Sequence, residues 1–489
     1  MKILLPLALV GAAASCLSAS AQPSAPSPRA PNVLFVMSDD LNNNLGVYGH
    51  PLVKSPNIDR LAQRGVRFDR AYCQFPLCNP SRASMFTGLR PDQIQIYDLD
   101  THFRFTTPEV VTLPQLFRRH GYEAVRVGKI YHFGVPEEIG SPGFDDPVSW
   151  NKTINPFGRD TANKDKLINF TPQIPIGGAL AYRIDEGPDE EQTDGWVATM
   201  AIRELGRLKE SGKPFFLGVG FYRPHLPFVA PKKYFDLYPL ESIPTPADPT
   251  ASLKNVPAPA FGTPLFAGLT PKQQRLMIRA YYASISFMDA QVGRVVDELE
   301  RLGLADNTII VFVSDHGFLL GEHGQWWKQR LFEESIRTPL IIAAPGSAHG
   351  TAPHPVEFVD IYPTVAELAH IPAPAGLAGR SLVPLLKQPA TPWPHAAFSQ
   401  TATGTAIRTD RWAYHEWGAG GADGKELYDH TADPAENHNL ANDPAYASVV
   451  AELSAQLRAA LPPRPAIGKP ERRPWWPKRS PGYIPDEDR

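Results

Sequence analysis

Cys78 opens the segment with the most distinctive chemistry in this chain of 489 residues, which has only three cysteines. Pro80 and the residues after it can begin a helix, because proline fits the first helical turn. That turn attracts anions through its free backbone N–H groups and its dipole, so a nucleophile at Cys78 would face a bound oxyanion. The thiol alone leaves metal binding, nucleophilic attack and a disulfide with Cys73 open. Pro76, between the two cysteines, fits a disulfide poorly.

Candidate ligands for a metal ion follow two apolar runs of matching pattern. Residues 33–37 lead into Ser-Asp-Asp, and residues 308–313 lead into Ser-Asp-His. The four candidate ligands are Asp39, Asp40, Asp315 and His316. Three carboxylates and one imidazole suit a divalent cation, and the predominance of oxygen favours Ca²⁺ or Mg²⁺. The alternative is that these side chains only cap strands and form salt bridges, which fits two adjacent pairs at equivalent strand ends less well.

Five basic side chains have the chemistry to act on an anionic ester. Arg82, Lys129 and Lys328 can offset the negative charge that develops as the ester bond breaks. His132 and His225 can move protons near neutral pH. Each of these residues alone would usually be a surface group, so the prediction depends on the elements that bring them together.

Short apolar runs that end in polar residues predict the sheet that positions these groups. The runs are residues 33–37, 122–127, 214–219, 308–313 and 339–344. Such runs are typical of strands covered on both faces. Helices are predicted between them, at residues 56–65, 113–120, 193–209 and 270–303. The alternation predicts an α/β fold with a mostly parallel sheet, in which ligands gather beyond the carboxyl ends of the strands.

The N-terminal residues predict export to the periplasm or the extracellular space. An apolar run over residues 3–14 precedes the A-x-A site at residues 19–21, so residues 1–21 are predicted to be a signal peptide. Cys16 makes a lipid anchor the less favoured alternative. No other stretch is long and apolar enough to predict a membrane span. The net charge of −3 gives no reason to expect nucleic acid as a partner.

Several segments together resemble the sulfatase family. The pattern Cys-x-Pro-Ser-Arg at residues 78–82 is similar to the family signature, and the residues around Lys129, His225 and Lys328 are similar to its active-site segments. Further matches lie at residues 55–62, 315–324, 359–364 and 426–440. The resemblance implies that the chain is a sulfuric ester hydrolase.

The resemblance also implies a fold and two domains. It predicts an alkaline-phosphatase-like catalytic domain over residues 22–387, with a large mixed, mostly parallel sheet sandwiched by helices. A smaller C-terminal α+β subdomain is predicted over residues 388–489, with a short antiparallel sheet near residues 406–428 and a helix at residues 446–461. The Pro-rich, basic tail after that helix is interpreted as a surface extension or, alternatively, as a contact for sugar.

The cofactors follow from the same resemblance. In this family a formylglycine-generating or sulfatase-maturing enzyme oxidises the cysteine, so Cys78 is expected to become formylglycine. One Ca²⁺ is expected to bind an oxygen of the converted Cys78 and the four ligands named above, Asp39, Asp40, Asp315 and His316. The hydrated aldehyde would attack sulfur. The sugar hydroxyl would then leave with a proton from His225 or Lys328, and His132, supported by Lys129, would let sulfate depart.

The expected substrate is a sulfated carbohydrate. His316 and the pair Tyr97-Asp98 resemble the iduronate-2-sulfatase branch of the family. Export and the family resemblance together imply exo action on oligosaccharides, and the branch resemblance favours a uronate 2-O-sulfate as the substrate. Two alternatives remain open at this point. One is a phosphonate or phosphate ester hydrolase on the same fold, and the other is a non-catalytic carbohydrate-binding relative.

Overall fold

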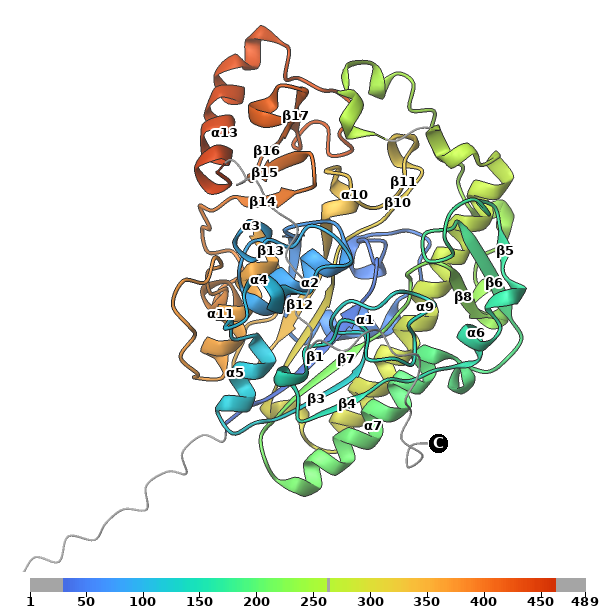
Figure 1. The fold of residues 1–489 in the computed structure, drawn as a ribbon, viewed down its shortest axis with the longest axis vertical. Helices are drawn as coiled ribbons and strands as arrows, with labels where there is room; N and C mark the ends of the chain where they lie inside the picture. Colours follow the sequence, from blue (N-terminus) through green and yellow to red (C-terminus); the bar gives the residue numbers. More distant parts are fainter. Residues whose placement is uncertain (1–29, 262–263, 463–489) are drawn as a thin grey trace, which may run out of the picture.

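A computed structural model describes residues 30–261 and 264–462 of the chain. Its centre is an eight-stranded sheet with the strand order β13-β2-β12-β9-β1-β7-β3-β4 (Figure 1). The strands are β1 (Asn32–Ser38), β2 (Val66–Tyr72), β3 (Glu123–Gly128), β4 (Lys152–Ile154), β7 (Phe215–Gly220), β9 (Thr308–Ser314), β12 (Arg337–Ala343) and β13 (Gly350–Glu357). The five predicted apolar runs all lie in this sheet.

The register of the central strands brings their carboxyl ends to one edge. β1 is parallel to both β9 and β7, with Met37 opposite Val313 on one side and Gly220 on the other. β3 is parallel to β7 and ends level with it at Gly128. β12 runs antiparallel to both of its neighbours, β9 and β2, so its carboxyl end lies at the opposite edge. The polar residues that follow β1, β3, β7 and β9 therefore meet at one place.

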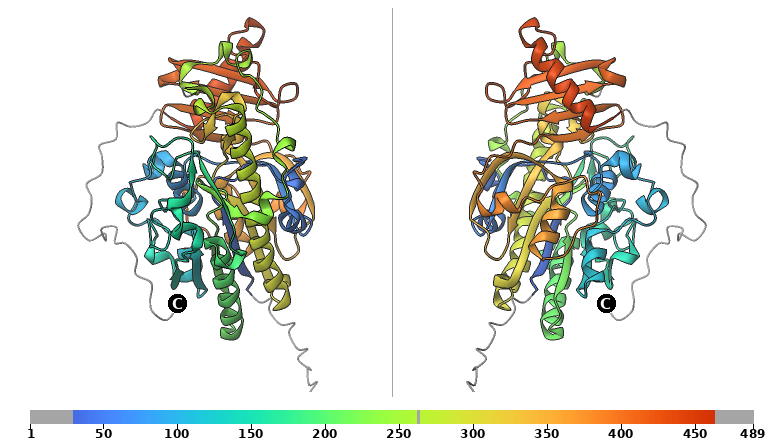
Figure 2. Two further views of the ribbon diagram at one scale, coloured as in Figure 1. Left: turned by 90° about the vertical axis from the view of Figure 1, so that its right-hand side faces the viewer. Right: turned by 90° about the vertical axis from the view of Figure 1, so that its left-hand side faces the viewer.

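Helices cover both faces of the sheet because successive strand residues point to opposite sides. Leu34 and Val36 of β1 belong to a core that packs against α1 (Pro56–Ala62), α7 (Thr193–Ser211) and α9 (Pro271–Arg301). Val33 and Phe35 belong to the core on the other face. The helices on that face are α2 (Cys78–Thr87), α5 (Leu113–Arg119), α11 (Ile361–Leu368) and α12 (Val383–Lys387). Figure 2 shows the long helices α7 and α9 running side by side.

The C-terminal part carries a second, antiparallel sheet. Its strands are β14 (Ala397–Gln400), β15 (Gly404–Arg408), β16 (Trp412–Trp417) and β17 (Gly424–Asp429), in that order. The helix α13 (Ala447–Ala460) covers one face of it through Leu453 and Leu457, which pack with Ile407 and Tyr414. The domain boundary between residues 387 and 388 stays a prediction.

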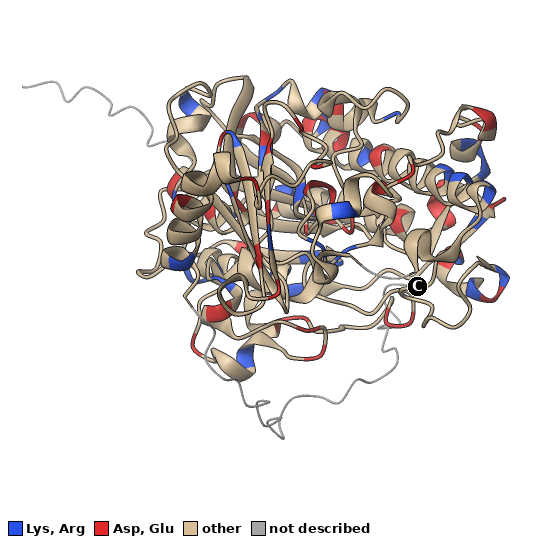
Figure 3. Ribbon diagram, turned by 90° about the horizontal axis from the view of Figure 1, so that it is seen from above, with Lys and Arg blue, Asp and Glu red and all other residues tan. Residues whose placement is uncertain are grey.

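Shorter elements join these layers. The helices are α3 (Pro91–Ile94), α4 (Phe103–Thr106), α6 (Arg159–Ala162), α8 (Lys232–Phe235) and α10 (Glu333–Ile336). The strands are β5 (Ile168–Asn169), β6 (Ala181–Asp185), β8 (Phe228–Pro231), β10 (Leu319–Leu320) and β11 (Trp326–Trp327). Lys and Arg are interspersed with Asp and Glu over the fold (Figure 3).

The predicted fold class is confirmed: a mixed, mostly parallel sheet lies between two helical layers, and a small antiparallel sheet follows. In the described part of the chain, no helix has the length and apolar character needed to cross a membrane. The predicted signal peptide, Cys16 and the tail from residue 463 onward lie outside the described residues.

Candidate active site

The helix α2 begins at Cys78 and holds it under the strand ends. Leu77, in front of it, is extended, with φ −152° and ψ 137°, and all ten residues of the helix are buried. Pro80 is tolerated because the N–H groups of the first turn have no partner within a helix. The predicted helix start is confirmed, and Cys78 lies at its positive end. Cys73 and Cys78 are both free, so the alternative of a disulfide between them is not realised.

The thiol of Cys78 lies among cationic side chains. Its Sγ is 3.2 Å from Nζ of Lys328 and 3.4 Å from Nε2 of His316. Burial alone would raise the pKa of this thiol, but Lys328, Lys129 and His316 lower it well below its ordinary value. The site therefore stabilises negative charge at the position of Sγ, as an oxyanion-binding site must.

A buried arginine holds two of the predicted metal ligands in place. The guanidinium of Arg82 donates to Asp39 Oδ1 at 3.0 Å and to Asp315 Oδ2 at 2.9 Å. Lys129 donates to the other oxygen of Asp39 at 2.6 Å. Burial would raise the pKa of Asp39, but Lys129 and Arg82 hold it well below its usual range. Asp39 is thus a charged carboxylate with a cation on each oxygen.

Asp40 is the point where most of the other predicted residues meet. Its backbone is left-handed, with φ 63°, and its N–H donates to Asp315 Oδ1 at 3.0 Å. Asp40 Oδ1 accepts from Lys328 Nζ at 2.6 Å and lies 3.3 Å from His316 Nε2. Asp40 Oδ2 is buried without a hydrogen-bond partner and lies 3.8 Å from His225 Nε2. An unpartnered buried carboxylate oxygen is costly unless a ligand or cation binds it.

The predicted ligands fit a divalent cation. Ligand atoms of Asp40, Cys78, Asp315 and His316 all lie within 4.8 Å of one another, and a second group joins Asp39, Asp40, Cys78 and His225. Burial would lower the pKa of His316, but the carboxylates beside it, Asp315 first, raise it to about 9. These carboxylates thus draw a proton onto His316, and a bound cation could replace that proton. The oxygen-rich set suits Ca²⁺ or Mg²⁺.

Two histidines face the thiol from the loops after β3 and β7. Burial lowers the pKa of His132, whose Nδ1 has no hydrogen-bond partner among the described residues, while the neighbouring Cys78 raises it. Nδ1 of His225 lies 2.6 Å from the carbonyl oxygen of Leu226, which fixes Nδ1 as the donor. Nε2 of His225 is therefore the atom that points toward Asp40, and it can accept or give a proton there.

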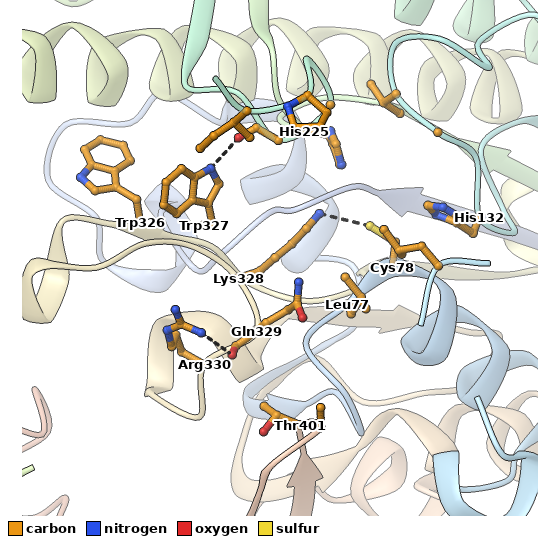
Figure 4. Close-up of a pocket in the computed structure, with 18 of the residues that line it drawn as sticks. Leu77, Cys78, His132, His225, Trp326, Trp327, Lys328, Gln329, Arg330 and Thr401 are labelled. Atoms are coloured by element: carbon orange, nitrogen blue, oxygen red, sulfur yellow. Dashed lines mark hydrogen bonds between the residues drawn. The ribbon is translucent and has the colours of Figure 1, made fainter. Parts of the chain in front are cut away.

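A cavity of about 670 Å³ opens above the thiol. Cys78, His132, His225 and Lys328 all line it (Figure 4). In the same view Trp327 donates its indole N–H to the carbonyl oxygen of Gly178, which fixes the ring against the cavity. This volume lies within the usual range for small-molecule sites.

Comparison with known proteins identifies the family of this chain. The family model described as Sulfatase matches residues 31–371, and the model for the N-sulphoglucosamine sulphohydrolase C-terminal region matches residues 321–461. The iduronate 2-sulfatase of Mus musculus is 35% identical over 397 residues, which are 70% of this chain and 69% of the relative. The chain belongs to the sulfatase family. This sulfatase is therefore a sulfuric ester hydrolase, as the sequence predicted.

Solved structures confirm the alkaline-phosphatase-like fold of the sulfatase. A structure solved with its substrate D-glucosamine-2-N,6-O-disulfate covers 88% of this chain and 97% of its own, with a TM-score of 0.68 and 22% identity. A phosphonate monoester hydrolase of Agrobacterium radiobacter covers 88% and 95%, with a TM-score of 0.70 and 25% identity. The fold is thus shared by enzymes that act on different esters, and the chemistry must be argued from the site.

The structure brings all the site residues predicted from the sequence into one neighbourhood. They are Asp39, Asp40, Cys78, Arg82, Lys129, His132, His225, Asp315, His316 and Lys328. Their individual roles stay predictions. Sequence reasoning missed part of the cavity wall, which includes Trp327, Arg330, Thr401 and Trp417. Trp327 and Arg330 lie within two residues of Lys328 in the sequence, so their place in the cavity wall could have been predicted. Thr401 and Trp417 belong to no recognisable motif.

Replacing Arg82 with methionine is expected to destabilise the sulfatase by about 3–5 kcal/mol, because it leaves buried carboxylates without their shared cation. Asp39 would keep only Lys129, and Asp315 would lose the guanidinium 2.9 Å from its Oδ2. Urea titration of the two proteins measures the difference in the free energy of unfolding.

The matched control is Arg301→Met, since the ion pair of Arg301 with Glu298 is on the exposed side of α9. That variant should unfold almost like the wild type. Equal stability of the Arg82 variant and the wild type would contradict the structural role of this arginine.

Proposed function

We propose that the sulfatase removes sulfate from carbohydrates by chemistry at Cys78. The environment of Cys78 Sγ supports this proposal. Lys328, Lys129 and His316 lower the pKa of the thiol, and the thiol lines a cavity large enough for a small molecule. The same charges would hold the anionic sulfate of a substrate. A thiol in apolar surroundings would instead be an inert core residue.

We further propose that Cys78 is converted to formylglycine and that one Ca²⁺ is held beside it. Asp39, Asp40, Asp315 and His316 would be the protein ligands, and the unpartnered Oδ2 of Asp40 supports this assignment. When present, the two groups supply a hydroxyl nucleophile and a positive charge that polarises the sulfate. Arg82 and Lys129 hold Asp39 in a fixed, charged state, so the donor set is preorganised.

The remaining residues would move protons and offset charge. Nε2 of His225 and Nζ of Lys328 both lie beside Asp40, and either can protonate the leaving sugar oxygen. His132 contacts the side chain of Cys78, and burial lowers its pKa, so it is a neutral base near neutral pH. It can therefore take a proton from the group at position 78 when sulfate leaves.

The proposed substrate is a sulfated sugar at the non-reducing end of an oligosaccharide, with a uronate 2-O-sulfate as the favoured case. Two findings support this choice. The relative from Mus musculus is an iduronate 2-sulfatase, and a protein of the same fold binds a sulfated glucosamine. Such a substrate is consistent with the predicted export of the protein after removal of residues 1–21. The proposed oxidation of Cys78 requires a second protein, a maturing enzyme, as a partner.

The state of Cys78 in active protein tests the proposal. Trypsin should release residues 71–82 as one peptide, because Arg70 and Arg82 flank it without a basic residue between. We expect mass spectrometry to show a peptide that has lost H₂S and gained one oxygen. The same preparation should hydrolyse an aryl sulfate much faster than an aryl phosphonate.

Two results would count against the proposal. A free thiol at Cys78 in fully active protein would remove the formylglycine step. A preference for the phosphonate would instead favour the alternative reaction that the Agrobacterium enzyme performs on the same fold.

A further inference from the structure

Arg330 is a second cationic group in the cavity, beside the residues that surround Cys78. It follows Lys328 by two positions, and both line the cavity. Figure 4 shows Lys328 reaching toward Cys78, whereas the guanidinium of Arg330 lies apart from the thiol, beyond Gln329. One short segment thus presents two separated positive charges to one cavity.

No carboxylate of the described residues offsets the charge of Arg330. Among the described residues, its side chain donates only to the carbonyl oxygen of Gln329, at 3.1 Å, and it forms no ion pair with a carboxylate. Its Nε is buried and has no hydrogen-bond partner. Glu137 is the one carboxylate that lines the cavity in the described part of the chain, against the two cations. Burial lowers the pKa of Arg330, so its charge is held at a cost that an anion would relieve.

Two other inward-facing arginines, Arg90 and Arg104, are paired with carboxylates. Arg90 makes two hydrogen bonds of 2.8 Å to the carboxylate of Glu357, and Arg104 pairs with Asp146. A guanidinium that lines a ligand cavity with free donors differs from these structural pairs. Its planar arrangement of donors matches a carboxylate or a sulfate group.

We propose that Arg330 binds a second anionic group of the substrate, the carboxylate of a uronate, while the sulfate lies at Cys78. This inference rests on the proposed function, since it assigns the two ends of a doubly charged substrate to two ends of one cavity. It makes Arg330 a specificity-determining residue. An aryl sulfate, which has no second anionic group, would not use it.

Paired substrates and the uncharged variant Arg330→Gln test this assignment. The substrates are a uronide 2-sulfate and its methyl ester, which keeps the sulfate and removes the second charge. For the wild type we expect kcat/KM to be on the order of 10- to 100-fold higher for the acid, the range for a hydrogen bond to a charged group. In Arg330→Gln this ratio should fall to near one, and Arg330→Lys should restore part of it.

The control variant is Arg203→Gln, since Arg203 is an exposed arginine on α7 and does not line the cavity. It should keep the wild-type ratio. A ratio that is the same in the wild type and in Arg330→Gln would overturn the inference while leaving sulfatase activity intact. The inference would also be overturned if Arg330→Gln lost only the preference for a 2,6-disulfated glucoside over a 2-sulfated glucoside. The second anionic group bound by Arg330 would then be a sulfate and not a carboxylate.

Binding of the free uronic acid can be measured without turnover. Calorimetric titration of this acid should show affinity about tenfold or more weaker for Arg330→Gln than for the wild type. If no sulfate ester were cleaved by either protein, the proposed function would fail, and this titration alone would decide the assignment of Arg330. Equal affinities would reject it.

Discussion

Replacing Cys78 with alanine is expected to abolish hydrolysis of sulfate esters and to leave the fold nearly unchanged. Removal of a nucleophile typically costs about 10⁴-fold or more in kcat. The change in stability should stay within about 1–2 kcal/mol, since one buried sulfur atom is lost from a helix whose other contacts remain. Sulfate release measures the first effect, and urea titration measures the second.

Cys78→Ser is the matched variant for this experiment. Its single hydroxyl can attack sulfur, but it has no second hydroxyl whose deprotonation would expel sulfate. At most one turnover per chain is expected, with a serine that keeps the sulfate and can be detected by mass. Continued turnover by the alanine variant would show that Cys78 is not the precursor of the nucleophile. Loss of its fold would count against a purely catalytic role for Cys78.

Replacing Asp40 with asparagine is the second change with a large expected effect. The two side chains have nearly the same shape, but the amide carries no negative charge. Asp40 accepts from Lys328 and contains the unpartnered oxygen Oδ2. We expect cation affinity and activity each to fall at least about 100-fold, because even residues that only support metal ligands contribute 10- to 100-fold.

Elemental analysis after dialysis measures the bound cation directly, and calorimetry gives its affinity for Ca²⁺ and Mg²⁺. The control is Asp297→Asn, since Asp297 lies on the exposed side of α9 in an ion pair with Arg60. It should retain the wild-type cation content. A full complement of cation in Asp40→Asn would exclude Asp40 as a ligand.

Chelation of the wild type should likewise remove activity, and added Ca²⁺ should restore it.

The elements with the strongest local patterns could be predicted from the sequence alone. The apolar runs became β1, β3, β7, β9 and β12, because strands buried on both faces need such runs. The matching Ser-Asp pairs of β1 and β9 ended side by side, since these strands are parallel neighbours in register. This register is why Asp39 and Asp315, which are far apart along the chain, could be assigned to one site.

Other features depend on long-range pairing that local patterns do not encode. β13 contains Pro353 and Pro355, so its sequence does not read as a strand, yet it pairs with β2 at the edge of the sheet, where proline is tolerated. The reversed direction of β12 has no local signal either. Thr401 and Trp417 reach the cavity from the antiparallel sheet, far along the chain from Cys78, and their sequence carries no trace of that contact.

The burial of α2 determines when, relative to folding, the proposed oxidation of Cys78 could take place. Cys78 is 1% exposed, and every residue of its helix is covered, partly by segments as distant as Asp315 and Lys328. An enzyme that modifies a peptide needs that peptide extended in its own cleft. A protein partner that oxidises Cys78 must therefore act on the chain before β9 and the Lys328 segment have closed over it. Under the proposed conversion of Cys78, maturation and folding would compete in time, and a chain that folded first would keep its thiol.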